Sequence, residues 1–275
     1  MSRPLKKVAI LGCGFIGTQL ALAIDSGAIP AKLERVYDSS KSASNDLVAR
    51  LKSKPEISQN AHLLSYPPVD IVVEAASQDA VRDIALSVIQ NRRDIIIMST
   101  GALLDSTISE VLSQASEEFG SRVYLPSGAI GGLDAIYSVR DHIREISITT
   151  TKHPTSLKDA PYFAQSEINV NDIVDDVVTL FQGSAADAVK LFPANVNVAA
   201  SVSMAAGQDV SVIVKADPHI TTNTHTIHVQ GSFGTMQFTL QNSPDPDNPK
   251  TSRLAALSAI NTLYKYCAHG IIVGS

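Results

Sequence analysis

The segment KKVAILGCGFIGTQLALAID, residues 6–25, decides the fold of this chain. Its first six residues form a short apolar run, which is typical of a parallel strand buried on both faces. Gly12, Gly14 and Gly17 follow at once in the pattern G-x-G-x-x-G, and apolar residues then recur at helical spacing. A strand, a glycine loop and a helix in this order predict the phosphate-binding unit of a dinucleotide-binding domain.

Each glycine of the loop has a distinct expected role. Gly12 permits the tight turn, Gly14 lets the backbone approach a pyrophosphate, and Gly17 permits close packing of the helix on the strand. Phe15 and Ile16 begin the helix, where free N–H groups and the helix dipole favour an anion. We therefore expect all five residues to contact the cofactor.

A second strand, residues 33–37, ends in Asp38, which stands 21 residues after Gly17. An acidic residue at this distance suits the ribose 2′-hydroxyl of NAD, although a carboxylate in a turn at a strand end is the simpler role. The Ser39-Ser40-Lys41 segment that follows can tolerate a 2′-phosphate. Both NAD and NADP therefore stay open as cofactors.

The next part of the chain alternates strands and helices. Strands are expected at 68–76, 94–98 and 122–125, and helices at 79–90 and 107–119. This alternation predicts an α/β fold with a doubly wound parallel sheet of the Rossmann type, whose ligand crevice lies beyond the carboxyl ends of the strands. Small residues after these strands are candidate cofactor neighbours, or plain turn residues: Ala75, Ala76, Ser99, Thr100 and Ala129.

From Glu145 onward the pattern changes to an alternation of period two, as in half-exposed strands. Such strands are expected at 145–152, 209–216, 224–230 and 235–241, with helices around 171–181, 185–192 and 198–206. This half predicts a second, α+β domain with a mainly antiparallel sheet. We expect a Rossmann domain at 1–125, completed by a C-terminal helical segment at 250–275, and a catalytic and dimerisation domain at 126–249.

One histidine of the second domain points inward by this alternation. His225 falls on the same strand face as Ile227 and Val229, whereas His228 falls on the opposite, polar face. Apolar surroundings lower the pKa of a histidine, which keeps the imidazole neutral and able to accept a proton near pH 7. His225 is thus either a core histidine with a satisfied hydrogen bond or a general base.

Composition excludes several classes of function. A net charge of −5 and a pI near 5.8 give no basic patch for nucleic acid, and no apolar run approaches the ~20 residues of a membrane span. Cys13 and Cys267 lie far apart with no Cys/His cluster, which argues against a disulfide framework and against a metal site. We expect a protein of the reducing cytoplasm.

A dinucleotide-binding domain joined to an α+β domain predicts an oxidoreductase, in which the protein supplies position, electrostatics and a proton acceptor. Acylating aldehyde oxidation needs a nucleophilic thiolate from the second domain. Cys13 lies in the phosphate loop and Cys267 in the last helix, so neither suits that role. Oxidation of an alcohol or an amine remains, with His225 as the base.

Several longer stretches are similar to those of a known family. They are EAASQDAV (74–81), STGAL (99–103), PSGAIGGLDAI (126–136), FPANVNVAAS (192–201), Asn223-Thr-His225, GSFG (231–234) and NPKTSRLAALSAI (248–260). Together, in this order and over nearly the whole chain, they resemble the L-aspartate dehydrogenase family.

The resemblance implies NAD(P)-dependent oxidative deamination of L-aspartate to oxaloacetate and ammonia through iminoaspartate, which can feed NAD biosynthesis. It also implies a homodimer, a catalytic role for His225, and NAD contacts at Ala129 and Asn197. The two substrate carboxylates need cationic or N–H partners, and for each lysine a solvated surface charge is the alternative. Our candidates for binding the substrate are Lys152, Asn195, Asn223, Lys250 and Thr251.

Two other functions stay open. One is a related Rossmann oxidoreductase that acts on another amino or hydroxy diacid, such as a malate-like substrate. The other is an NAD(P)-binding sensor without turnover, although the intact base and cofactor-facing residues argue against it. A sensor would bind NAD(H) with no substrate-dependent change in absorbance.

Overall fold

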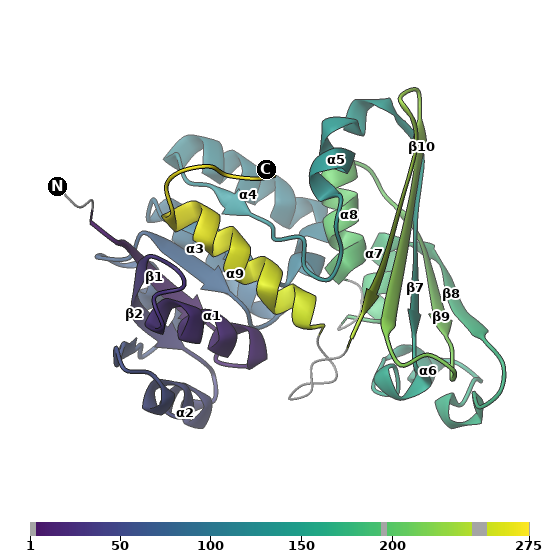
Figure 1. Ribbon diagram of the computed structural model, residues 1–275, viewed down its shortest axis with the longest axis horizontal. Coiled ribbons are helices and arrows are strands. Elements are labelled where there is room, and N and C mark those ends of the chain that lie inside the picture. The colour runs from purple at the N-terminus through teal and green to yellow at the C-terminus, as the bar shows by residue number, and fades with distance from the viewer. Residues whose placement is uncertain (1–3, 194–196, 244–251, 275) are drawn as a thin grey trace. The chain divides into compact units, whose positions relative to one another are not determined.

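A computed structural model describes residues 4–193, 197–243 and 252–274 of this chain. The chain divides into two compact units, each made of residues that contact one another more than they contact the rest. The first unit comprises Met1–Pro126 and Ala256–Ser275, and the second comprises Ser127–Ala255. Figure 1 traces both units, with the C-terminal helix beside the first strands of the chain.

The first unit is built on a six-stranded sheet in the order β3-β2-β1-β4-β5-β6, with every pair parallel. This order and direction are those of a doubly wound dinucleotide-binding sheet, so the prediction of a Rossmann-type fold is confirmed. The strands are β1 (Lys6–Leu11), β2 (Ala31–Tyr37), β3 (Glu56–Ile57), β4 (Ile71–Glu74), β5 (Asp94–Ile97) and β6 (Val123–Tyr124).

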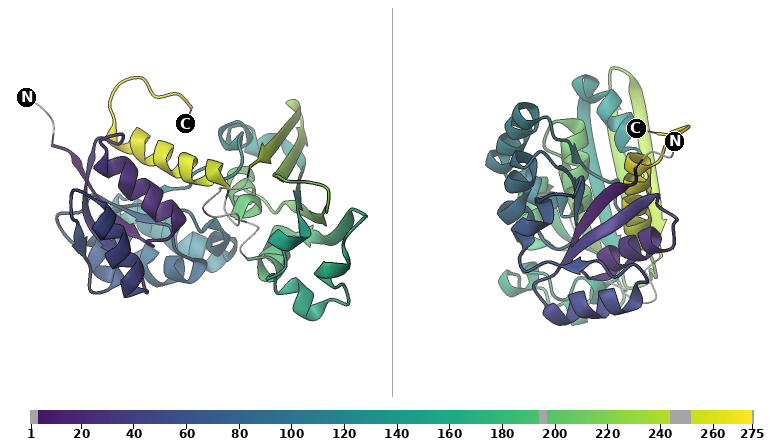
Figure 2. Two further views of the ribbon diagram at one scale, coloured as in Figure 1. Left: turned by 60° about the horizontal axis from the view of Figure 1, so that its bottom comes forward. Right: turned by 90° about the vertical axis from the view of Figure 1, so that its left-hand side faces the viewer.

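Helices cover both faces of this sheet. On one face α1 (Phe15–Asp25), α2 (Lys41–Arg50) and α9 (Arg253–Cys267) bury apolar side chains against the strands. On the other face lie α3 (Gln78–Gln90) and α4 (Ser106–Phe119), as the right-hand view of Figure 2 shows. Coverage on both faces explains why the central strands are apolar at consecutive positions.

The second unit is built on a five-stranded sheet in the order β11-β10-β7-β9-β8. β7 and β9 are parallel, and the other three pairs are antiparallel, so the prediction of a mainly antiparallel sheet is confirmed. The strands are β7 (Ile143–Lys152), β8 (Val178–Ser184), β9 (Ser211–Ala216), β10 (Asn223–Gly231) and β11 (Gly234–Asn242).

Three helices of the second unit, α5 (Leu133–Ser138), α7 (Ala185–Leu191) and α8 (Asn197–Ala206), lie on one side of this sheet (Figure 1). The strand residues on the covered face are apolar over most of their length, whereas the opposite face carries threonine, glutamine and serine. The described residues also form the short helix α6 (Tyr162–Gln165) and several 3₁₀ turns: η1 (Ala61–Ser65), η2 (Thr100–Leu104), η3 (Arg140–His142), η4 (Pro154–Ser156) and η5 (Val170–Asp172).

The predicted helix at 171–181 is wrong. Only the 3₁₀ turn η5 forms at its start, and Val178–Ser184 is the edge strand β8, paired antiparallel with β9. The residues Val-Val-Thr-Leu-Phe are branched or aromatic and suit a pleated, half-buried surface better than a helix. Among the described residues, no helix is both long enough and apolar enough to cross a membrane.

Candidate functional site

The glycine loop between β1 and α1 has the geometry that a bound dinucleotide requires. Gly12 adopts a φ of +95°, and a Cβ there would lie 2.5 Å from the Ala75 carbonyl oxygen. A Cβ on Gly17 would overlap the Gly12 carbonyl oxygen. A Cβ on Gly14, in contrast, would meet no atom within 4 Å. Gly12 and Gly17 are thus needed for the fold of the loop itself, and Gly14 leaves open space where a pyrophosphate can approach.

The N-terminus of α1 can receive an anion. Its N-cap residue, Gly14, has no side chain to bond the first N–H groups, and no acidic residue stands in the first turn. The half-buried Phe15 and Ile16 are the first two helical residues. Backbone N–H groups at a helix start, together with the helix dipole, are suited to phosphate.

Asp38 lies at the end of β2, where the sequence predicts it, and holds the neighbouring loops together. One carboxylate oxygen accepts a hydrogen bond from the Cys13 N–H at 2.8 Å, and the other accepts from the Ser40 N–H at 2.8 Å. Because each carboxylate oxygen has two lone pairs, acceptance from a ribose hydroxyl is still available. The Cys13 thiol is buried, and this burial raises its pKa to about 11, so it is a protonated thiol at neutral pH.

The small residues predicted after β4 and β5 lie in two adjacent loops at the carboxyl edge of the sheet. Ala75 is half-buried and Ala76 is exposed, whereas Ser99 and Thr100 are buried. The two loops are joined by Glu74, the last residue of β4, which the sequence reasoning missed. The only signal in the sequence is a carboxylate at the end of an otherwise apolar strand, Ile-Val-Val-Glu.

A cluster of polar side chains occupies one end of the covered face of the second sheet. Thr150 and Lys152 come from β7, and Asn223 and His225 come from the neighbouring β10; all four are at most 6 % exposed. His225 and Thr150 are directly paired across the two strands. The structure therefore brings together three of the residues predicted for catalysis and substrate binding, and adds Thr150 to them.

His225 points into the interior of the second unit, as the alternation predicts, and is 3 % exposed. Burial, reinforced by the charge of Lys152, lowers the pKa of His225 to about 3, so the imidazole is neutral near pH 7. Its Nδ1 lies 3.0 Å from the Thr150 hydroxyl. If Nδ1 carries the proton and donates to Thr150, Nε2 is left as the proton acceptor.

Lys152 is not a solvated surface lysine, which was the alternative to its predicted role in binding a substrate carboxylate. It is 6 % exposed, and burial lowers the pKa of its ammonium group to about 8. A lysine is rarely buried so fully, and a buried, perturbed ionisable group is a mark of functional sites. At neutral pH the group is still mainly protonated, so it can bind a carboxylate.

The remaining predicted residues of the second unit are placed as follows. Ala129 precedes α5, and its carbonyl oxygen accepts a hydrogen bond of 2.8 Å from the Asn242 side chain at the end of β11. Asn197 is the first residue of α8. Asn242, which pairs with Asn223 across the strands, is a second polar residue that sequence reasoning missed. Three predicted substrate residues lie outside the described part of the chain: Asn195, Lys250 and Thr251.

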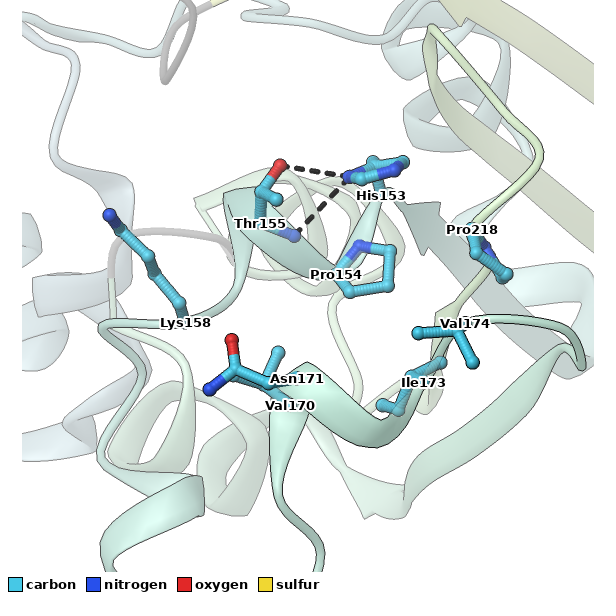
Figure 3. A pocket seen from close by; sticks show the side chains of 9 residues that line it. All are labelled: His153, Pro154, Thr155, Lys158, Val170, Asn171, Ile173, Val174 and Pro218. Carbon is cyan, nitrogen blue, oxygen red and sulfur yellow. Dashed lines mark hydrogen bonds between the residues drawn. The ribbon is translucent and has the colours of Figure 1, made fainter.

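A pocket of about 330 Å³ also lies in the second unit, between η4 and η5 (Figure 3). His153 lines it and bonds through Nδ1 to Thr155, while Lys158 and Asn171 border it from exposed positions. None of the predicted site residues lines this pocket. Three of its polar residues, Thr155, Lys158 and Asn171, are exposed, and His153 is half-buried, so its lining is more open to solvent than the cluster around His225.

Metal binding has no support in the described residues. Over residues 4–193, 197–243 and 252–274, no group of three or more His, Cys, Asp or Glu side chains is arranged to hold a metal ion. The glycine loop, by contrast, fits a nicotinamide dinucleotide. The second unit, taken by itself, carries a buried histidine and a buried lysine, His225 and Lys152.

Family models match both halves of the chain. The model described as "Homoserine dehydrogenase, NAD binding domain" matches residues 12–126, and the model described as "Aspartate dehydrogenase, C-terminal" matches residues 134–266. The first agrees with the glycine loop and its sheet. The second covers the polar cluster of the second unit.

Relatives match over nearly the whole chain. The L-aspartate dehydrogenase of Nitrosopumilus maritimus is 57% identical over 98% of this chain and 100% of its own length, and that of Methanocella arvoryzae is 43% identical over 95% and 97%. The crystal structure of aspartate dehydrogenase from Thermotoga maritima superposes with a TM-score of 0.75, at 28% identity over 98% of this chain and all of that one. With an NAD-binding domain and these relatives, the chain belongs to the L-aspartate dehydrogenase family and is an NAD(P)-dependent amino-acid dehydrogenase.

Proposed function

We propose that this enzyme oxidises L-aspartate to iminoaspartate, which water then converts to oxaloacetate and ammonia. The observation that carries the proposal is the pair of a buried lysine and a buried neutral histidine on neighbouring strands, Lys152 and His225. A cation for a carboxylate and a base for an amine are the two groups that an acidic amino acid needs. The names of the relatives support L-aspartate as that amino acid.

The reaction removes a hydride from Cα and a proton from the amine nitrogen, so that a C=N bond forms. When NAD(P) is bound, its nicotinamide ring supplies the hydride acceptor. His225 either takes the proton from the amine or activates the water that hydrolyses the imine. Lys152 binds a substrate carboxylate, with Asn223 beside it as a further hydrogen-bonding group, and we also assign Asn195, Lys250 and Thr251 to the substrate.

Substrate binding strengthens His225 as a base. Without substrate, burial and the Lys152 charge disfavour the imidazolium ion. The negative charge of a bound carboxylate offsets the Lys152 charge, and this raises the pKa of His225. The histidine thus accepts a proton readily only when a carboxylate substrate is in place.

We assign the cofactor contacts to Gly12, Gly14, Phe15, Ile16, Gly17 and Asp38, to Ala75, Ala76, Ser99 and Thr100, and to Ala129 and Asn197. Asp38 favours NAD by accepting from a ribose hydroxyl, and the exposed Ser39-Ser40-Lys41 segment leaves NADP acceptable. We further propose a homodimer that works in the cytoplasm, where its two buried, free thiols stay reduced, and that supplies iminoaspartate to NAD biosynthesis.

The test is absorbance at the reduced-nicotinamide band with L-aspartate, D-aspartate, L-glutamate and L-malate, each with NAD and with NADP. His225→Asn is compared with His228→Asn, because His228 is exposed on the opposite face of the same strand. We expect turnover with L-aspartate that is lost only in the His225 variant, while NADH binding persists in both. Turnover with malate instead would reject the substrate, and NADH binding without any turnover would favour a sensor.

A further inference from the structure

Glu74 is a fully buried carboxylate, 0 % exposed, at the carboxyl end of β4. Its Oε1 accepts hydrogen bonds from the Ala76 N–H and from the Ser99 hydroxyl, both at 2.8 Å. Its Oε2 accepts from the Ser99 N–H at 3.0 Å and from the Met98 N–H at 3.2 Å. One side chain thus accepts hydrogen bonds from four donors in two different loops, and the Met98 N–H donates in addition to the Glu74 carbonyl oxygen at 3.1 Å.

The two loops are those that carry predicted cofactor contacts. The bond to Ala76 fixes the loop between β4 and α3, and the bonds to Met98 and Ser99 fix the loop between β5 and η2. The first loop also meets the glycine loop, since the Ala75 carbonyl fills the space beside Gly12. Through these contacts, the position of Glu74 determines the spacing of three loops at the ligand edge of the parallel sheet.

Hydrogen-bond donors converge on the carboxyl group of Glu74. Burial raises its pKa, and the hydrogen bonds from Ser99, Ala76 and Met98 oppose that effect. Among the described residues, Glu74 forms no ion pair, so these donors are what stabilise the carboxylate. An amide of the same shape offers only one acceptor atom, and its NH₂ group would face N–H donors on one side.

We infer that Glu74 is a positioning residue of the nicotinamide-nucleotide site, which holds the loops after β4 and β5 in the geometry that binds the cofactor. Glu74 itself does not touch the cofactor in this role; it acts through Ala76 and Ser99. The inference rests on the proposed assignment of cofactor contacts to these loops. It does not depend on which amino acid is oxidised.

The experiment compares NADH binding and thermal unfolding of Glu74→Gln with those of the wild-type enzyme. The chain has no tryptophan, so the fluorescence of NADH itself is the binding signal. Ser121→Ala is the matched control, because Ser121 is buried in the same unit and its hydroxyl bonds the Ile89 carbonyl, away from the ligand edge. We expect Glu74→Gln to bind NADH at least about tenfold more weakly, because the NH₂ group of glutamine faces a backbone N–H donor. Ser121→Ala should bind NADH normally.

A second readout separates positioning from general stability. In Glu74→Gln the KM for NAD should rise, while the KM for L-aspartate at saturating NAD stays within about twofold of wild type. An unchanged NADH affinity, with a melting temperature lowered to the same extent as in Ser121→Ala, would show a merely structural role and overturn the inference. If Glu74→Gln does not fold, Glu74→Asp decides, because its shorter carboxylate cannot reach both loops; normal NADH affinity in it would also overturn the inference.

The outcome is independent of the substrate proposal. Wild-type turnover of L-aspartate is measured in the same series. Weaker NADH binding in Glu74→Gln with no wild-type turnover of L-aspartate would reject the substrate and keep the role of Glu74. Wild-type turnover of L-aspartate with unaltered NADH binding in Glu74→Gln would keep the substrate and reject the role of Glu74.

Discussion

Lowering the pH from 7.5 to 5 should destabilise this protein through His225, because that side chain is folded into the interior as a neutral imidazole. Its pKa lies near 6.5 in the unfolded chain and is lowered to about 3 in the fold. Because the fold lowers the pKa of His225, the stability that this group contributes is fully present only at pH values above its pKa in the unfolded chain. That stability is lost as the pH falls from about 6.5 toward 3, since the unfolded chain binds the proton first.

The size of the loss follows from the two pKa values. A pH of 5 is 1.5 units below the pKa of His225 in the unfolded chain and still above its pKa in the folded protein. Each unit in this window costs about 1.4 kcal/mol, so the free energy of unfolding should fall by about 2 kcal/mol between pH 7.5 and pH 5 from this group alone. Other groups titrate in the same range; burial raises the pKa of Glu74, which acts in the opposite direction.

The difference between wild type and His225→Asn isolates the histidine. Asparagine is neutral at every pH and its side-chain amide can still bond Thr150 in place of Nδ1. Urea unfolding followed by circular dichroism at pH 7.5, 6.5, 5.5 and 5.0 gives the free energy of unfolding of each protein. We expect the difference between the two proteins to change by about 2 kcal/mol in favour of the variant as the pH falls. Parallel curves would refute the assignment of His225 as a buried, neutral base.

Three further predictions concern single side chains. Thr150→Val, which removes the hydroxyl at the His225 Nδ1, should lower kcat about tenfold or more while Thr150→Ser stays close to wild type; normal kcat in the valine variant would exclude control of the tautomer. Gly14→Val should weaken NADH binding about 100-fold with an unchanged melting temperature, because a Cβ at Gly14 meets open space. Gly17→Val should lower the melting temperature, because a Cβ at Gly17 overlaps the Gly12 carbonyl oxygen; fluorescence titration and calorimetry separate the two effects. Asp38→Asn should raise the ratio of kcat/KM for NADP to that for NAD about tenfold, since it removes a negative charge that repels a 2′-phosphate, and an unchanged ratio would place the 2′-position elsewhere.

Much of the first unit could be predicted from sequence because local signals there agree with one another. Continuous apolar runs predict the strands, and the glycine loop predicts both a tight turn and a dinucleotide as the ligand. The role of Glu74 could not be predicted, because its four partners belong to residues 2 to 25 positions away. Only the parallel pairing of β4 with β5 brings the Met98-Ser99 segment beside it.

In the second unit the alternation placed His225 correctly but left its surroundings open. The partner Thr150 is 75 residues away. Lys152 was a candidate for binding a substrate carboxylate, but the sequence left a solvated surface charge as an equal alternative. The helix expected at 171–181 failed for a related reason. Its branched and aromatic residues suit a strand, and the segment forms β8 because β9 offers an edge to pair with; the sequence of the segment does not reveal that pairing partner.

The polar cluster of the second unit nevertheless shows a regularity, which becomes clear once the pairing of the strands is known. On the covered face of the sheet, the side chains of β7 change from isoleucine to Thr150 and Lys152 toward the C-terminal end of that strand. Those of β10 change from Val229 to His225 and Asn223 toward its N-terminal end, and β11 ends in Asn242. Because β10 is antiparallel to both neighbours, the polar end of each strand falls at the same end of the sheet. Buried polar groups cost stability wherever they stand, and a fold under selection for stability alone has no reason to gather them. Three strands that become polar at one shared end therefore point to chemistry at that end, whatever the identity of the substrate.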